Sequence, residues 1–100
     1  MFVIAKIQVK NFTKLEVFEN IVQSYLSSVG GKMLHAFEIT QIAGSNNEEV
    51  HILEFPNEKC FEEYKVKTNI PSLNSLREEA IKSIEIKLST KNKVYKSKSA

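Results

Sequence analysis

The order in which two hydrophobic periodicities follow one another most constrains how this chain can fold. Apolar and polar side chains alternate over residues 2–9, apolar residues recur at helical spacing over 13–29, and alternation returns over 32–43 and 49–55. A second helical segment, interrupted at Asn69-Ile70-Pro71, precedes a last alternating segment at 82–88. Because period two is typical of strands and a period of about 3.6 of helices, the predicted order is strand, helix, strand, strand, helix, strand.

This βαββαβ order is that of the ferredoxin-like α+β sandwich, in which one antiparallel four-stranded sheet carries two helices on one face. We predict that residues 1–89 form this single domain and that residues 90–100 form a Lys/Ser-rich flexible tail. The chain length of 100 residues also suits one domain.

Local signals predict where several elements begin and end. Thr13 and Glu16 have the spacing of a capping box at the start of the first helix, and Gly30 suits its C-terminus. Residues 44–47, Gly-Ser-Asn-Asn, predict a hairpin turn between the second and third strands. Asn57 and Ser72 are the expected caps of the two parts of the second helical segment.

Charge and composition make several classes of protein improbable. Four of the fourteen basic side chains lie in the last ten residues, so residues 1–90 carry ten basic and twelve acidic side chains. A near-neutral body with a short basic tail does not predict nucleic-acid binding, which requires a basic face on the fold. The third strand also lacks the basic residue and the glycine of an RNA-recognition run.

Other classes are disfavoured by single features. The one cysteine, Cys60, cannot form an intrachain disulfide, and there is no cysteine cluster for a metal. No apolar run approaches the length of about 20 residues that spans a bilayer, and the N-terminus has no secretory signal pattern. We therefore expect a cytoplasmic protein with no membrane segment, no metal and no cofactor.

The predicted sheet has a second face that the helices leave open. Several strands place apolar side chains on it, and a monomer rarely exposes so large an apolar patch. A second copy applied with twofold symmetry would cover this face, so the sequence predicts a homodimer through the open sheet face.

Three short motifs resemble a known family. They are Gly30-Gly31-Lys32 after the first helix, Leu53-Glu54-Phe55-Pro56-Asn57 after the third strand, and Leu73-x-x-Leu76-Arg77 late in the second helical segment. Together, over about residues 2–88, they resemble a family of unknown function in the dimeric α+β barrel superfamily. That superfamily includes antibiotic-biosynthesis-type monooxygenases, haem-degrading enzymes, muconolactone-type isomerases and small stress-induced proteins. The resemblance implies a small-molecule pocket between the sheet and the helices.

His35 and His51 are the only histidines, and histidine is the usual proton carrier near neutral pH. We take both as candidate catalytic residues, with a partly buried histidine in an ordinary hydrogen bond as the alternative. We expect His35 to share a sheet face with Met33 and Phe37. Whether His51 lies on that same face depends on the hairpin register, which the sequence leaves open.

Four further residues are candidate ligand contacts. Arg77, the only arginine, is a potential clamp for an anion, or else forms a salt bridge with Glu62, Glu63 or another surface acid. Glu54 is a potential base within the sheet, or else it pairs with Lys6 or Lys87 or faces solvent at the dimer edge. Tyr25 and Tyr64, on the inner stripes of the helices, either line the pocket or are core residues with their hydroxyls at its rim.

The sequence therefore predicts a small dimeric protein with a small-molecule pocket, and the first hypothesis is a cofactor-free enzyme similar to a monooxygenase or an isomerase. The absence of tryptophan disfavours the haem-degrading type. The alternative is a non-enzymatic ligand-binding or stress-related dimeric module.

Overall fold

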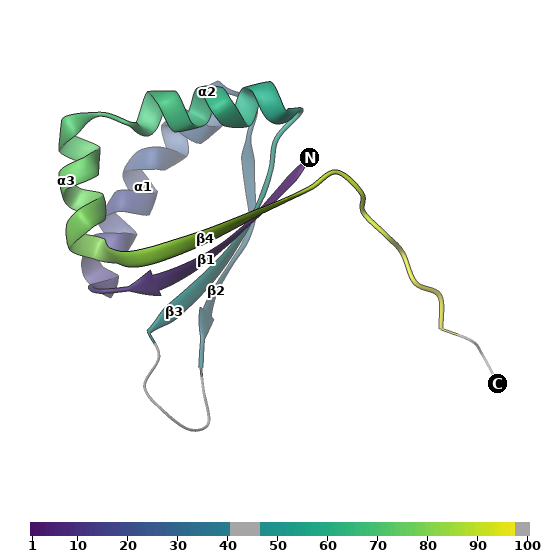
Figure 1. Cartoon of the computed structure of the whole chain (residues 1–100), viewed down its shortest axis with the longest axis horizontal. Helices are drawn as coiled ribbons and strands as arrows, with labels where there is room; N and C mark the ends of the chain where they lie inside the picture. Colours follow the sequence, from purple (N-terminus) through teal and green to yellow (C-terminus); the bar gives the residue numbers. More distant parts are fainter. Residues whose placement is uncertain (41–46, 98–100) are drawn as a thin grey trace.

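A computed structural model describes residues 1–40 and 47–97 of the chain. The elements follow in the order β1 (Phe2–Val9), α1 (Phe12–Ser28), β2 (Lys32–Ile39), β3 (Glu48–Glu54), α2 (Glu58–Thr68), α3 (Pro71–Ala80) and β4 (Ile81–Ser89). The four strands form one antiparallel sheet in the order β2-β3-β1-β4, and the helices lie on one side of it (Figure 1). This is the ferredoxin-like fold, as predicted.

The central strand β1 sets the two faces of the sheet. Val3, Ala5, Ile7 and Val9 are buried beneath the helices, as their alternation predicts, while the intervening side chains lie on the other face, here called the open face. Their cross-strand partners follow the same division, because side chains at directly opposed positions share a face. In β4, the aliphatic residues therefore lie on the helix side and the charged residues on the open face.

An irregularity in β2 places His35 on a different face of the sheet from the one expected. The register against β3 shifts between Met33 and His35, so that Met33 pairs with Leu53 but His35 pairs with Ile52. Leu34 is the extra residue, and a single extra residue reverses the alternation that follows it. The prediction that Met33 and His35 share a face is therefore wrong: Met33 faces the helices, and His35 faces away from them.

Asparagine side chains cap two helices. The side-chain oxygen of Asn11 accepts a hydrogen bond from the backbone N–H of Lys14 at 3.0 Å, so α1 begins at Phe12 and the expected capping box at Thr13 does not form. The earlier start adds the Leu15 N–H to Asn11 carbonyl hydrogen bond and packs Phe12 against the core. Asn57 caps α2 as predicted, accepting from Cys60 N–H at 2.9 Å.

The interruption at Asn69-Ile70-Pro71 separates α2 from α3, as predicted. Pro71 occupies the first turn of α3, where its missing N–H removes no helical hydrogen bond, and Ile70 is the N-cap residue. The expectation that Ser72 caps this helix is therefore wrong. Ser72 already lies inside the helix, because proline favours the start of a helix one residue earlier.

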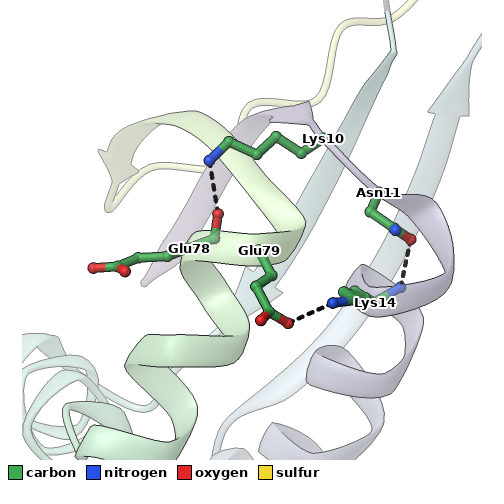
Figure 2. A network of polar contacts seen from close by, with 5 residues as sticks. All are labelled: Lys10, Asn11, Lys14, Glu78 and Glu79. Carbon is green, nitrogen blue, oxygen red and sulfur yellow. Dashed lines mark hydrogen bonds and ion pairs between the residues drawn. The ribbon is translucent and has the colours of Figure 1, made fainter.

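Polar contacts join the start of α1, and the residues just before it, to the last turn of α3 (Figure 2). Lys10 Nζ donates to the Glu78 carbonyl oxygen at 2.8 Å, and Lys14 Nζ lies 2.6 Å from a carboxylate oxygen of Glu79. The backbone N–H groups of Lys10 and Asn11 both donate to the Ala80 carbonyl. These contacts hold α1 and α3 side by side over the sheet, and they fix the positions of the side chains that the two helices direct towards it.

Two of the motifs quoted above form one packing unit. Gly30 has a φ of +75°, as expected for a glycine at the C-terminal end of a helix. A Cβ atom on Gly31 would lie 2.9 Å from the Phe55 ring, and one on Gly30 would lie 3.1 Å from Pro56 Cγ. The two glycines therefore allow the end of α1 to approach Phe55 and Pro56 closely.

The remaining expectations concern the ends of the strands and the tail. The predicted turn at residues 44–47 and the predicted extension of the second strand to residue 43 lie largely outside the described residues. Residues 90–97 contain no helix or strand and run away from the body of the fold (Figure 1). Within the described ranges, no helix combines the length and the apolar character that a membrane crossing requires.

Candidate functional site

A cavity of about 370 Å³ lies between the sheet and the helices. The sheet supplies a mainly apolar floor from β1, β3 and β4: Val3, Ala5, Ile7, Leu53, Ile84 and Ile86. Ile84 and Ile86 pair with Ile7 and Ala5 of β1, yet remain 47% and 44% exposed because β4 is the edge strand. The cavity is therefore apolar inside and open along β4.

Besides the exposed Lys65, four titratable side chains line this apolar cavity, each from a different element. They are Glu19 of α1, His51 of β3, Tyr64 of α2 and Arg77 of α3. Converging polar groups in an otherwise apolar pocket are typical of a small-molecule site. We call these four residues the polar cluster.

His51 lies at the centre of the sheet, where its neighbours leave space for the ring. Its cross-strand partners are Ala5 on β1 and Ala36 on β2. The residue is only 3% exposed. Its Nε2 lies 2.8 Å from a carboxylate oxygen of Glu49, and its Nδ1 lies 3.7 Å from a carboxylate oxygen of Glu19. The imidazole therefore separates two carboxylates that come from different elements.

Glu19 is the carboxylate of the polar cluster. Burial raises the pKa of Glu19 above its ordinary value of 4.5, and the nearby Glu49 raises it further, while His51 and Arg77 act in the opposite direction. A carboxyl group with a raised pKa can both accept and donate a proton nearer to neutral pH than an exposed one. This makes Glu19 the strongest candidate for acid–base chemistry in the cavity.

Arg77 is held at the cavity wall by groups from both sides of the α2–α3 junction. One guanidinium nitrogen donates to the Thr68 carbonyl at 3.2 Å, and another donates to the Asn74 side chain. The guanidinium also lies over the Phe18 ring, 5.1 Å from its centre. These contacts differ from the alternative of a salt bridge with Glu62 or Glu63, and they present a fixed cation to the cavity.

Tyr64 contributes a neutral phenol. Burial raises the pKa of the Tyr64 hydroxyl above its ordinary value, and the Glu19 charge adds to that rise, while Arg77 opposes it. The hydroxyl therefore keeps its proton at neutral pH and can donate a hydrogen bond to an oxygen of a bound molecule.

The other three residues singled out from the sequence lie elsewhere. His35 is on the open face, where its ring stacks on Phe37 with centres 5.3 Å apart. Glu54 pairs with Phe2 and Lys32, also on the open face. Tyr25 packs beside the buried cluster around Ile7 and Leu15. The fold thus brings together His51, Tyr64 and Arg77, and separates them from His35, Glu54 and Tyr25.

Sequence reasoning missed Glu19 and Glu49. Glu19 occupies the inner stripe of α1, because Leu15, Glu19, Val22 and Leu26 recur at intervals of three or four residues. A charged residue at such a position was the signal available in the sequence. Glu49 offers a weaker signal. It lies two residues before His51, so the two share a face of β3, but this follows only if the segment is already known to be a strand.

The cluster has no arrangement typical of a metal site. Among residues 1–40 and 47–97, no three His, Cys, Asp or Glu side chains are grouped so that they could hold a metal ion. What the polar cluster can do is bind a polar group of an otherwise apolar molecule and exchange a proton with it.

Comparisons with known proteins agree with the fold. No protein-family model matches the chain, and no curated protein matches it. Among solved structures, a NIPSNAP family protein of unknown function from Agrobacterium tumefaciens is 25% identical, with 86% of this chain and 82% of that chain covered and a TM-score of 0.63. A protein of unknown function from Rhodopseudomonas palustris is 12% identical, with 93% and 83% covered and a TM-score of 0.63.

A third solved structure is a dimeric ferredoxin-like protein from an uncultured marine organism. It is 10% identical, with 95% of this chain and 100% of that chain covered and a TM-score of 0.61. The class defined by the fold is therefore that of ferredoxin-like α+β proteins. Within it, the solved structures similar to this chain include a NIPSNAP family protein of unknown function and a dimeric ferredoxin-like protein.

Proposed function

We propose that the cavity between the sheet and the helices binds a small, largely apolar molecule and that Glu19 exchanges a proton with it. The observation that carries this proposal is a partly buried carboxyl group, that of Glu19, which has a raised pKa and lies beside a histidine and a fixed guanidinium in an apolar cavity. The activity would be that of a cofactor-free enzyme similar to an isomerase or a monooxygenase. The resemblance to the dimeric α+β barrel superfamily supports a ligand pocket at this place.

The chemistry follows from the polar cluster. Ionised Glu19 would accept a proton from a carbon or hydroxyl group next to a carbonyl, and the negative charge would move to the carbonyl oxygen. Arg77 and the Tyr64 hydroxyl would stabilise that oxygen through charge and hydrogen bonding. Protonated Glu19 would then return the proton, at another carbon in the case of an isomerase.

A thermal-shift screen tests ligand binding. The purified protein is heated with small acids, phenols, quinones, flavins and haem, because a ligand that binds only the folded state raises the melting temperature. We expect a shift with at least one small acid, phenol or quinone, and its loss or reduction in Glu19→Gln and Arg77→Lys. Glu63→Gln, on the exposed face of α2, is the control and should keep the shift. A shift that survives both cluster variants would contradict the proposed site.

Two further assays separate an enzyme from a binding module. Compounds that bind are incubated with the protein in D₂O, and deuterium incorporation is followed by NMR while oxygen uptake is followed with an electrode. Glu19-dependent deuterium incorporation without oxygen uptake indicates the isomerase type, and oxygen uptake indicates the monooxygenase type. Binding without either result would overturn the enzymatic proposal and leave the ligand-binding or stress-related module.

We also propose that two copies associate through the open face. The centre of this face is apolar, with Ile4 38% exposed and Phe37 50% exposed. Ile52 pairs with Ile4 across β1 and β3, and charged pairs such as Lys6–Glu48 lie around this centre. An apolar centre with a polar surround is the usual composition of a protein interface. The likeness to a dimeric ferredoxin-like protein supports the same arrangement.

The mass in solution tests the dimer. Light scattering on a dilute sample should give twice the chain mass of 11.4 kDa. Ile4→Glu places a charge in the centre of the interface and should give the monomer mass. Ile21→Glu is the matched control, because Ile21 is 43% exposed but lies on α1, away from the open face. A monomer mass for the unmodified protein would refute the proposal.

A further inference from the structure

A second cavity lies on the helix side, next to the first. It has a volume of about 360 Å³ and is bordered by α1, β2 and β3. Its lining is more polar than that of the first cavity and includes Glu16, Asn20, Gln23, Glu38 and Glu49. The two cavities share Met33, Glu19 and His51, so these side chains form the partition between them.

The titratable residues that line only one of the two cavities differ in their chemistry. Tyr64 and Arg77 line only the first cavity, whereas Glu49 and Glu38 line only the second. His51 contacts both sides, since its Nε2 is hydrogen-bonded to Glu49 at 2.8 Å and its Nδ1 faces Glu19. Glu19 itself borders both cavities, and the buried imidazole gives it a second connection, through Glu49, to the more polar one.

The hydrogen bond to Glu49 also determines which ring nitrogen can accept a proton. An ionised carboxylate only accepts hydrogen bonds, so Nε2 must carry the proton when the ring is neutral. Nδ1 is then left with its lone pair, and the nearest carboxylate oxygen of Glu19 lies 3.7 Å from it. The neutral ring is thus in the tautomer that can accept a proton from Glu19 while donating one to Glu49.

We propose that Glu19, His51 and Glu49 form a proton relay, in which the second cavity is the solvent end and Glu49 exchanges the proton with water. Protonated Glu19 gives its proton to Nδ1 of His51, and Nε2 releases its own proton to the Glu49 carboxylate. Glu49 then transfers that proton to water, which leaves Glu19 ionised and the neutral ring with its proton on Nδ1. Exchange with water returns the ring to the Nε2–H tautomer, which the 2.8 Å hydrogen bond to Glu49 favours, before the next transfer. In this scheme Glu49 is a positioning and relay residue that does not touch the ligand. The relay rests on the proposed role of Glu19.

The distances are compatible with this sequence of steps. The Glu49 contact is a hydrogen bond, while the 3.7 Å between Nδ1 and Glu19 is longer than one. A rotation of the Glu19 side chain that shortens the distance between its carboxylate and Nδ1 by about 1 Å would form the hydrogen bond. This is a small movement for a side chain that borders two cavities.

Other charged and titratable groups surround the relay. Glu16 borders its cavities from α1, Glu38 from β2, Tyr64 and Lys65 from α2, and Arg77 from α3. Glu38 is the direct cross-strand partner of Glu49. Like charges in opposed positions on a sheet are destabilising, so packing alone does not account for this pair.

The tautomer of His51 tests the relay without any ligand. The full chain is labelled with ¹⁵N-histidine, and NMR at alkaline pH identifies the ring nitrogen that carries the proton. We expect Nε2–H on His51 in the unmodified protein. In Glu49→Gln, Glu19 becomes the one ionised neighbour of the ring, so a population with Nδ1–H should appear. The ¹³C titration midpoint of Glu19 should also move to lower pH, because the nearby Glu49 charge is removed and because Nδ1–H would donate to the ionised form of Glu19.

Glu38→Gln is the control, because it removes a charge from the same cavity but leaves the His51–Glu49 hydrogen bond. Its tautomer should match that of the unmodified protein. Finding Nδ1–H in the unmodified protein would overturn the relay, since Nδ1 could not then accept a proton. An unchanged tautomer in Glu49→Gln would overturn the role of Glu49. Either result is separable from failure of the proposed function, which the ligand screen with Glu19→Gln and Arg77→Lys measures independently.

Discussion

Gly31→Ala should destabilise this fold strongly, although it adds only one methyl group. An added Cβ would lie 2.5 Å from Leu26 Cδ1 and 2.9 Å from Phe55 Cε1, both closer than carbon atoms approach without repulsion. Leu26 and Phe55 are each 1% exposed, so neither side chain can move outwards into solvent. The strain must therefore be taken up by displacement of the end of α1 from the strand that leads into α2.

The size of the effect follows from the cost of overpacking. Extra atoms in a well-packed core typically cost about 1–3 kcal/mol, and two immobile neighbours suggest about 2 kcal/mol here. For a domain of this size, about 2 kcal/mol corresponds to a fall in melting temperature of about 8–16 °C.

Urea unfolding at one fixed protein concentration measures this change. The midpoint should fall while the slope of the transition stays constant, since the surface exposed on unfolding is unchanged. Adding Leu26→Ala removes one of the two clashing groups, so the double variant should be more stable than the sum of the single effects predicts. A Gly31→Ala protein within about 0.5 kcal/mol of the unmodified one would refute the reasoning, because this is the usual range of a substitution without consequence.

Three further predictions concern charge, capping and the tail. Because the pKa of Glu19 is raised in the folded state, its contribution to stability is present below its unfolded pKa and is lost as pH rises through the folded pKa. In urea unfolding, the free energy of unfolding of Glu19→Gln should therefore increase relative to that of the unmodified protein as pH rises from about 4 to 7. A difference between the two proteins that does not depend on pH would contradict this. Asn57→Ala removes the cap of α2 and should cost about 1 kcal/mol in the same assay, whereas no loss would show that the cap is dispensable. We also propose that residues 1–89 are the folding unit, so a chain ended after Thr90 should keep its melting temperature; a fall of several degrees would assign the tail a structural role.

The architecture was predictable because it rests on alternation that every strand displays. Val3, Ala5, Ile7 and Val9 share a face in any antiparallel sheet, and no tertiary information is needed to see it. The face of His35 was not predictable in the same way. It depends on one extra residue in β2, and an irregularity of that kind changes the register without changing the local composition.

The site was predictable only in part, for a similar reason. Arg77 and Tyr64 were noticeable from chemistry or from their place on an apolar stripe, and His51 as one of two histidines. Glu19 resembles any other glutamate on a helix until the helix is placed over the sheet. Its significance comes from the burial that α1 receives from β3 and α3, which is a property of the tertiary structure and not of the sequence around it.

The position of β1 has a consequence for how the protein is made. β1 is the first strand of the domain to leave the ribosome, yet it pairs with β3 on one side and with the last strand, β4, on the other. At ordinary rates of translation, roughly 4–16 s separate the synthesis of β1 from that of β4. During that interval one edge of the central strand has no partner, and its apolar residues are only partly covered. Chains that stop before Ile81 are therefore expected to aggregate or to bind chaperones, although they already contain most of the core.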